Sequence, residues 1–244
     1  MPNDSNGLNE KFLRLFTGVE QALKGRLHLP ANDRTAVGAM INKFVARNPY
    51  WKDSANRLRL LADIRNVVTH QLGTARGYPV AVTSHAVEAL RGIKKHLLKP
   101  EAVSHRHLNP VLTVSPDHSL AAVLAMAIDN AFSQFPVVAD GRFGGLITEN
   151  EIIRWLGRRV KANSVDVDLS SITVKTLLKE KDSSLKGIAI FHFDRLDSPV
   201  EEVMSRFSIE PALEVILLTQ SGSKHTPLEG IITQWDAARY PAPK

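Results

Sequence analysis

Apolar side chains recur at intervals of three and four residues through the first hundred residues, which is the spacing of amphipathic helices. In the first predicted helix this spacing is set by Leu13, Phe16, Val19 and Leu23. Four helices are expected, over residues 8–27, 35–46, 53–71 and 84–98, with the stretch G-T-A-R-G-Y-P at 73–79 as a turn. The N-terminal part is therefore predicted to be an all-α four-helix bundle.

Beyond Pro100 the pattern changes to short apolar strands that alternate with helices in the order β-α-β-β-α. The first set is expected over residues 111–114, 119–131, 135–138, 142–148 and 150–160. The second set is expected over residues 188–193, 198–207, 214–219 and 228–233, followed by a helical tail from Trp235. Tight turns at Asp140-Gly141 and Ser221-Gly222 occupy the same place in both sets. The closing strands, G-L-I-T-E-N-E and G-I-I-T-Q-W-D, match almost letter for letter, so the chain contains an internal repeat.

This repeat divides the chain into three predicted parts. Residues 1–100 form the helical part, 101–163 the first repeat, and 164–244 the second repeat together with the connector before it. The connector is charged and rich in serine, with one short helix expected around residues 174–178. The expected fold is thus an all-α bundle followed by a tandem α/β module of two β-α-β-β-α units.

The net charge of +6 is distributed unevenly along the chain. Residues 1–100 hold 16 Lys and Arg against 7 Asp and Glu, whereas the remaining 144 residues hold 15 against 18. All of the basic excess therefore lies in the helical part. A concentrated basic surface is typical of proteins that bind polyanions, although solvated helix faces alone would give the same composition.

Several kinds of site are excluded by composition and spacing. The absence of cysteine excludes disulfides, thiolate zinc sites and cysteine nucleophiles, and the histidines show no metal-ligand spacing. No apolar run approaches the roughly 20 residues that span a membrane, and the N-terminus lacks the features of a signal peptide. Trp51, Trp155 and Trp235 are expected to be packing residues. We expect a cytoplasmic protein that binds neither metal nor membrane.

Each repeat ends in glycine, two aliphatic residues, threonine, two free positions and an acid, and in this it resembles the CBS domain. The preceding Q-F-P-V-V-A-D-G strengthens the resemblance, which covers about residues 104–241. It implies a regulatory module that binds an adenosine compound, with AMP, ADP, ATP, S-adenosylmethionine and cyclic dinucleotides all known for the family. The ligand-binding residues that the resemblance implies are Gly145, Thr148 and Glu151 in the first copy and Gly230, Thr233 and Asp236 in the second.

The same threonines and acids have a structural interpretation. Thr-x-x-Glu at a strand-to-helix junction is the capping box, in which the threonine oxygen and the acid satisfy free amides at the helix start. Thr148 and Glu151 fit this pattern, and Glu151 stands where the family usually has aspartate. A phosphate at such a helix start would also meet amides and a favourable dipole, so capping and ligand binding are compatible.

The third predicted helix separates into two faces when residues 57–72 are wound at about 100° per residue. Its apolar face holds leucine, isoleucine and valine, while Arg65, Asn66, Thr69 and His70 share the polar face. The motif R-N-x-x-x-H at the end of this helix resembles the HEPN superfamily, over roughly residues 8–99. That resemblance implies a metal-independent ribonuclease of toxin-like type, in which two protomers join their motifs into one composite site.

The chemistry of these residue types suits RNA cleavage without metal. Histidine titrates near neutrality, so His70 can serve as base or acid for the 2′-hydroxyl and the leaving oxygen. Arg65 can donate two hydrogen bonds to the phosphate as negative charge builds, and Asn66 can orient His70 or the phosphate.

Two functions follow from these motifs. The first is a homodimeric protein whose HEPN-like part binds and cleaves RNA under control of an adenine nucleotide bound to the CBS pair. The second is a non-enzymatic nucleotide sensor, in which the helical part serves dimerisation or docking.

Overall fold

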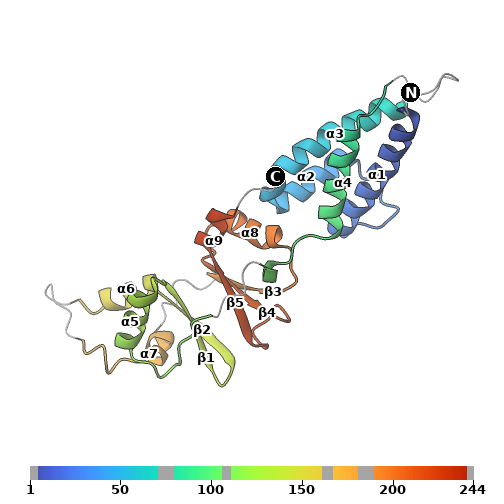
Figure 1. Ribbon diagram of the computed structural model, residues 1–244. Helices are drawn as coiled ribbons and strands as arrows, with labels where there is room; N and C mark the ends of the chain where they lie inside the picture. The colour runs from blue at the N-terminus through green and yellow to red at the C-terminus, as the bar shows by residue number, and fades with distance from the viewer. Residues whose placement is uncertain (1–4, 71–79, 106–110, 161–166, 181–189, 241–244) are drawn as a thin grey trace. The chain divides into compact units, whose positions relative to one another are not determined.

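The computed structural model describes residues 5–70, 80–105, 111–160, 167–180 and 190–240 (Figure 1). The chain forms two compact units that do not follow its linear order. The first unit contains Met1–Val103 together with Pro199–Glu210 and Ala237–Lys244, and the second contains Ser104–Ser198 and Pro211–Asp236. The predicted three-part division along the sequence stays a prediction.

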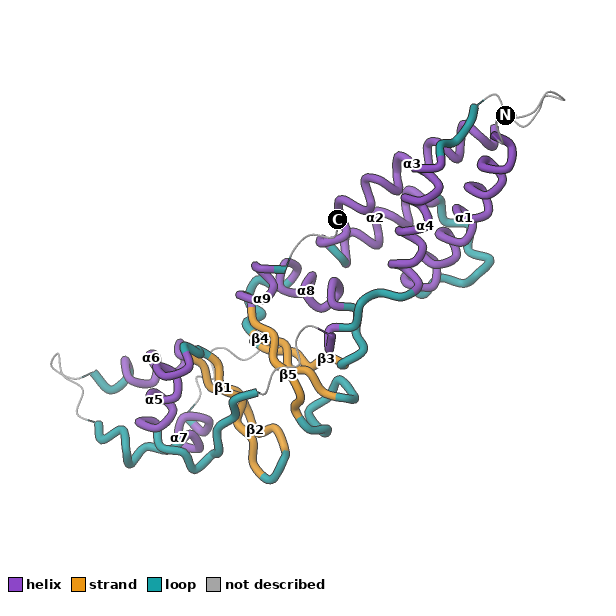
Figure 2. The backbone as a smooth tube through the Cα atoms, in the orientation of Figure 1, coloured by secondary structure: helices purple, strands orange, loops and turns teal. Residues whose placement is uncertain are grey.

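The N-terminal region is helical, and an α/β region follows it, as predicted (Figure 2). Its elements are α1 (Ser5–Arg26), α2 (Val37–Arg47), η1 (Pro49–Trp51), α3 (Lys52–His70) and α4 (Ser84–Leu98). They share one apolar core whose largest members are Phe12, Phe16, Leu23, Met40, Ile41, Phe44, Trp51, Leu58, Leu90 and Leu97. Burial of these side chains is the main favourable term for this unit. Gln71 and the predicted turn at 73–79 lie outside the described residues, and the four-helix bundle stays a prediction.

Asn9 is a polar residue inside this apolar core. Its side chain is completely buried, with Nδ2 donating to the carbonyl of Val80 at 2.7 Å and Oδ1 accepting from the amide of Val82 at 2.8 Å. A buried amide group is tolerated where its hydrogen bonds are made. Asn9 therefore ties α1 to the segment that leads into α4.

Helix α8 (Val200–Ile209), which lies in the second repeat of the sequence, belongs to the helical unit. Glu202 accepts from Nη2 of Arg26 at 2.5 Å, while Nη1 of Arg26 donates to the carbonyl of Leu97 at 3.2 Å. The buried carboxylate of Glu201 lies 2.6 Å from Nε2 of His96. Two neighbouring acids of α8 thus contact the last turns of α1 and α4.

Helix α9 (Gln234–Arg239) crosses the division between the units, because its residues from Ala237 onward belong to the helical unit. The hydroxyl of Tyr50 donates to the carbonyl of Ala237 at 2.7 Å, and the rings of Tyr50 and Tyr240 meet edge to face. Burial raises the pKa of the Tyr50 hydroxyl above its ordinary value.

The first repeat contains α5 (Leu120–Asn130), the hairpin β1 (Gln134–Ala139) and β2 (Arg142–Thr148), and α6 (Glu149–Gly157). The strand expected at 111–114 is not a full strand in the described residues, because only Val114 makes a bridge, to Val137. Val114 donates to the carbonyl of Pro136 and accepts from Val138. Pro116 has no N–H group, so the ladder does not continue beyond Val114 on that side.

The second repeat forms a three-stranded sheet of β3 (Phe191–Arg195), β4 (Val215–Thr219) and β5 (Leu228–Thr233). Strand β3 runs parallel to β4, and β4 runs antiparallel to β5. The bridge at Val114 and the hairpin β1–β2 have the same sequence of parallel and antiparallel pairing. The internal repeat predicted from sequence is therefore present in the pairing of the described strands.

The two repeats meet through an apolar cluster. Leu146 of β2 packs with Val215 and Leu217 of β4, and all three side chains are fully buried. The ring of Phe143 contacts those of Phe191 and Phe193, with centroids 5.3 and 5.1 Å apart. Helix α7 (Val174–Lys179), close to the expected short helix of the connector, packs on β2. This packing holds both sheets in the second compact unit.

Candidate functional site

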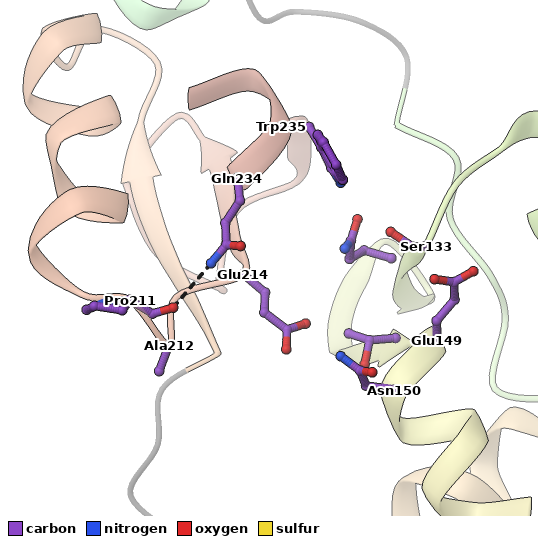
Figure 3. Close-up of a pocket in the computed structure, with 10 residues that line it drawn as sticks. Ser133, Glu149, Asn150, Pro211, Ala212, Glu214, Gln234 and Trp235 are labelled. Atoms are coloured by element: carbon purple, nitrogen blue, oxygen red, sulfur yellow. Dashed lines mark hydrogen bonds between the residues drawn. The ribbon is translucent and has the colours of Figure 1, made fainter. Parts of the chain in front are cut away.

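A cavity of about 370 Å³ opens between the two repeats, entirely within the second compact unit (Figure 3). One wall comes from the first repeat, at the start of β1, the end of β2 and the start of α6. The other comes from the second repeat, at the segment before β4 and the start of α9. The lining residues are Ser133, Gln134, Thr148, Glu149, Asn150, Pro211, Ala212, Glu214, Gln234 and Trp235.

The first wall is shaped by the capping box of α6. The amide of Glu151 donates to Oγ1 of Thr148, and the amide of Thr148 donates to Oε2 of Glu151, both at 3.3 Å. The capping interpretation of these residues is therefore confirmed. Thr148 is buried, whereas Glu149 and Asn150, at the first two positions of the helix, are exposed and line the cavity.

The second wall has a related but different junction. Oδ2 of Asp236 accepts from the amide of Thr233 at 2.8 Å and from its hydroxyl at 2.9 Å. The side-chain amide of Gln234 donates to the carbonyls of Pro211 at 3.3 Å and Leu213 at 2.7 Å. These bonds brace the start of α9 against the segment that precedes β4, so this wall is held by direct hydrogen bonds.

The predicted ligand-binding residues lie around the cavity rather than inside it. Thr148 is the one of the six that lines it among the described residues. A Cβ at Gly145 would come within 2.8 Å of the Leu178 side chain, so this glycine allows close packing of α7. Gly230 is buried in β5, opposite Leu218. Ligand roles for Gly145, Glu151, Gly230, Thr233 and Asp236 stay predictions.

The residues that line the cavity include the two positions that the repeat motif leaves free. These are Glu149 and Asn150 in the first copy and Gln234 and Trp235 in the second. Trp235 was expected to be a packing residue, and this is wrong, because 69% of it is exposed. Trp51 and Trp155 are buried, as expected. The signal that was missed is positional: both pairs are the first two residues of a helix that directly follows a closing strand.

The predicted R-N-H motif is only partly described. Arg65 donates to Glu20 at 2.5 Å and to Oδ1 of Asn66 at 3.1 Å, and its Cζ lies 4.9 Å from the centre of the Phe16 ring. Asn66 is exposed. His70 is the last residue of α3, and its side chain lies outside the described residues. Arg65 and Asn66 are thus neighbours on one face, with the guanidinium already paired to a carboxylate.

Comparison with protein families identifies residues 103–158 as a CBS domain. This match covers the first repeat, and the CBS resemblance of that repeat is confirmed. A comparison with curated proteins gives no match. None of the described helices combines the length and the apolar character that a membrane span requires. Within the described residues, no three His, Asp or Glu side chains gather as a metal-binding group.

Solved structures of CBS proteins match part of this chain. A conserved CBS-domain protein of unknown function from Thermoplasma acidophilum is 18% identical, with 58% of this chain and 70% of that chain covered and a TM-score of 0.42. A hemolysin-like protein with a CBS domain from Oenococcus oeni is 19% identical, with 57% and 88% covered and a TM-score of 0.39. A CBS domain pair in complex with 5-methylthioadenosine and S-adenosyl-L-methionine is 18% identical, with 57% and 94% covered and a TM-score of 0.42.

Proposed function

We propose that the chain is a regulatory sensor that binds an adenosine compound in the cavity between its repeats. The observation that carries this proposal is that equivalent positions of the two motif copies, Glu149-Asn150 and Gln234-Trp235, line the same cavity. The match of residues 103–158 to the CBS domain supports it, since the CBS resemblance implies a regulatory module that binds an adenosine compound. A concave site with a few convergent polar groups is also the usual form of a small-molecule site.

The lining residues offer suitable contacts for a nucleoside. The exposed indole of Trp235 stands at the edge of the gap and presents a flat face on which an adenine ring can stack (Figure 3). Ser133, Gln134 and Asn150 supply a hydroxyl and two amides that can bond to base or ribose atoms. Aromatic stacking is worth about 1–3 kcal/mol per base, so Trp235 carries a large share of the expected affinity.

Ligand binding is expected to raise the melting temperature of the purified protein. Adenosine, AMP, ATP and S-adenosylmethionine are each titrated by calorimetry and by thermal unfolding, because a ligand at 100 times its Kd stabilises the native state by about 2.7 kcal/mol. Trp235→Ala should weaken binding by about tenfold or more. The matched control is Phe132→Ala, since Phe132 is 48% exposed but does not line the cavity. Absence of a shift with every adenosine compound would contradict the proposal.

We expect ligand binding to act on the helical unit through α9. Gln234 and Trp235, at its start, line the cavity, and the carbonyl of Ala237 accepts the hydrogen bond from Tyr50. A ligand that shifts the start of α9 therefore acts on a contact of the helical unit. It regulates only if it binds two arrangements of α9 with different affinity.

A second function that we propose is metal-independent RNA cleavage by a homodimer of the helical part. It is favoured by the pairing of Arg65 with Asn66 on one face of α3 and by the basic excess of residues 1–100. The ion pair with Glu20 opposes it, because Arg65 must leave this carboxylate to contact a phosphate. This function is distinct from the sensor and has its own test.

Purified protein is expected to cleave total RNA in the presence of EDTA under this second proposal. Arg65→Ala and His70→Ala should each lower the rate by about a hundredfold or more, since one removes charge stabilisation and the other a proton-transfer group. Arg57→Ala is the control, because Arg57 is exposed on the same helix. Intact RNA at every concentration of added adenosine compound would exclude the nuclease and leave the sensor.

A further inference from the structure

The helical unit has a cavity of its own, of about 260 Å³, lined by residues of η1, α3 and α4. The buried side chains of Trp51 and Ile93 form the apolar part of its lining, and Ser54, Arg57 and His96 form the polar part. Sites for drug-sized molecules have volumes of about 300–1,000 Å³. This cavity is smaller, so it suits a ligand smaller than a nucleotide.

Helix spacing brings the polar groups of the cavity together. Ser54 and Arg57 are three residues apart on α3, and Gly92 and His96 are four residues apart on α4, so each pair shares one face of its helix. The rings of Trp51 and His96 are also close, with centroids 6.0 Å apart. Because the cavity is small, a ligand that fills it contacts groups from both helices.

The polar groups of the lining favour an anion. Arg57 is exposed, and within the described residues neither its guanidinium nor the hydroxyl of Ser54 has a hydrogen-bond or ion-pair partner. No Asp or Glu is among the described residues that line the cavity. A guanidinium offers parallel donors that match the oxygens of a carboxylate or a phosphate. The cavity therefore holds an unneutralised positive charge beside a hydroxyl.

The imidazole of His96 adds a further polar group. Its Nε2 atom is buried and lies 2.6 Å from the carboxylate of Glu201. Since 37% of the His96 side chain is exposed, the exposed part of the ring is the side away from Nε2, which carries Nδ1. Glu201 thus occupies one ring nitrogen, and the other remains for a ligand.

Gly92 is an independent sign that this space is kept open. It lies in the middle of α4, where glycine is less favourable than any residue except proline, yet an added Cβ would meet no atom within 4 Å. Gly25, Gly38 and Gly157 have equally open surroundings, but each lies at or next to a helix end, where helices fray. Neither packing nor a positive φ requires glycine at position 92. A larger side chain there would occupy part of the cavity.

We propose that this cavity binds a small organic anion, a carboxylate or a phosphate monoester, whose charged group contacts Arg57, Ser54 and His96. Gly92 leaves the space that the body of the ligand fills. Arg57 lies just over two turns before Arg65 on α3, so the site is separate from the residues proposed for RNA cleavage. Binding of this anion depends on neither of the two functions proposed above.

The test uses benzoate, phenyl phosphate and the neutral benzamide as ligands of the full chain. Benzoate and benzamide have nearly the same shape and differ in charge. Each is titrated by calorimetry and by NMR, with the indole N–H signal of Trp51 as the local reporter. The wild-type protein should bind at least one anion about tenfold more tightly than benzamide, because charge-assisted hydrogen bonds are the stronger ones. The tighter of the two anions shows whether the charged group is a carboxylate or a phosphate.

Gly92→Leu fills the cavity without removing a polar group. The Kd for the anions should rise at least about tenfold, whereas the melting temperature without ligand should stay the same or rise, since leucine has a much higher helix propensity than glycine. The matched control is Gly25→Leu, because Gly25 also has open surroundings and lies on α1 outside the cavity lining. This control should keep the wild-type Kd.

Arg57→Gln tests the charge separately from the space. Binding of both anions should weaken about tenfold, and the affinity for benzamide should not change. Arg14→Gln, at an exposed position of α1 outside the cavity lining, should bind as the wild type does.

Three results would overturn the assignment. Equal affinity for benzoate and benzamide would leave only an apolar cleft, and unchanged binding in Gly92→Leu would mean that the anion binds elsewhere on the chain. Absence of binding of either anion to the wild-type protein would also contradict it. In each case the sensor and the nuclease stand, because their tests use adenosine compounds and RNA.

Discussion

Replacing Asn9 with alanine is expected to lower the free energy of unfolding of the helical unit by about 3 kcal/mol. The side chain is fully buried and satisfies both the carbonyl of Val80 and the amide of Val82. Its removal leaves the buried amide of Val82 and the partly buried carbonyl of Val80 without this partner, and a buried group left so costs about 1–3 kcal/mol. Denaturant unfolding followed by far-UV circular dichroism measures the change.

The matched control for this substitution is Asn6→Ala. Asn6 lies on the same helix one turn earlier and is exposed, so its loss should change stability by about 0.5 kcal/mol or less. If Asn9→Ala were as mild as Asn6→Ala, the segment before α4 would have to find other partners for its amide and carbonyl. The two hydrogen bonds of Asn9 to that segment would then not contribute to stability.

The contact between His96 and Glu201 gives the second large expected effect. Glu201 is 3% exposed and its carboxylate lies 2.6 Å from the His96 ring nitrogen, so His96→Leu leaves a buried acid without this partner. Removal of one member of a buried pair costs about 3–5 kcal/mol. Because 37% of the His96 side chain is exposed, water screens part of this loss, and we expect a decrease near 2 kcal/mol.

A double substitution separates the pair from its packing. His96→Leu/Glu201→Leu should recover most of the lost stability, because two apolar side chains then replace both polar groups. Lys95→Gln is the control, since Lys95 is the exposed neighbour of His96 on α4. Additive losses in the double variant would show that the two side chains act independently and do not stabilise each other.

Local pattern was enough to predict most elements. The four helices of the N-terminal region, α7 and strand β5 lie within a few residues of their predicted positions, because periodicity and turn residues act over short distances. The exception in the first repeat is the strand expected at 111–114, in which only Val114 makes a bridge among the described residues, because pairing depends on the facing strand as well as on the apolar pattern.

Local sequence pattern does not predict long-range contacts. Nothing in the sequence around Glu201 or Glu202 indicates that α8 joins the helical unit, since the partners, Arg26 and His96, lie more than a hundred residues earlier. The cavity shows the same limit. The threonines and acids of the motif can be recognised in the sequence. Which residues beside them line the cavity depends on how the two repeats pack. Trp235 was therefore misplaced in the interior.

The composition of the helical unit has a consequence for how the protein is made. Its first hundred residues leave the ribosome well before Pro199–Glu210, which complete the same unit. N-terminal domains generally fold first during synthesis. Here the partners of Arg26 and His96, Glu202 and Glu201, are translated only much later. A truncated product that ends before α8 would leave the ends of α1 and α4 uncovered. We expect the quality-control proteases of the cell to degrade it as an incompletely folded domain.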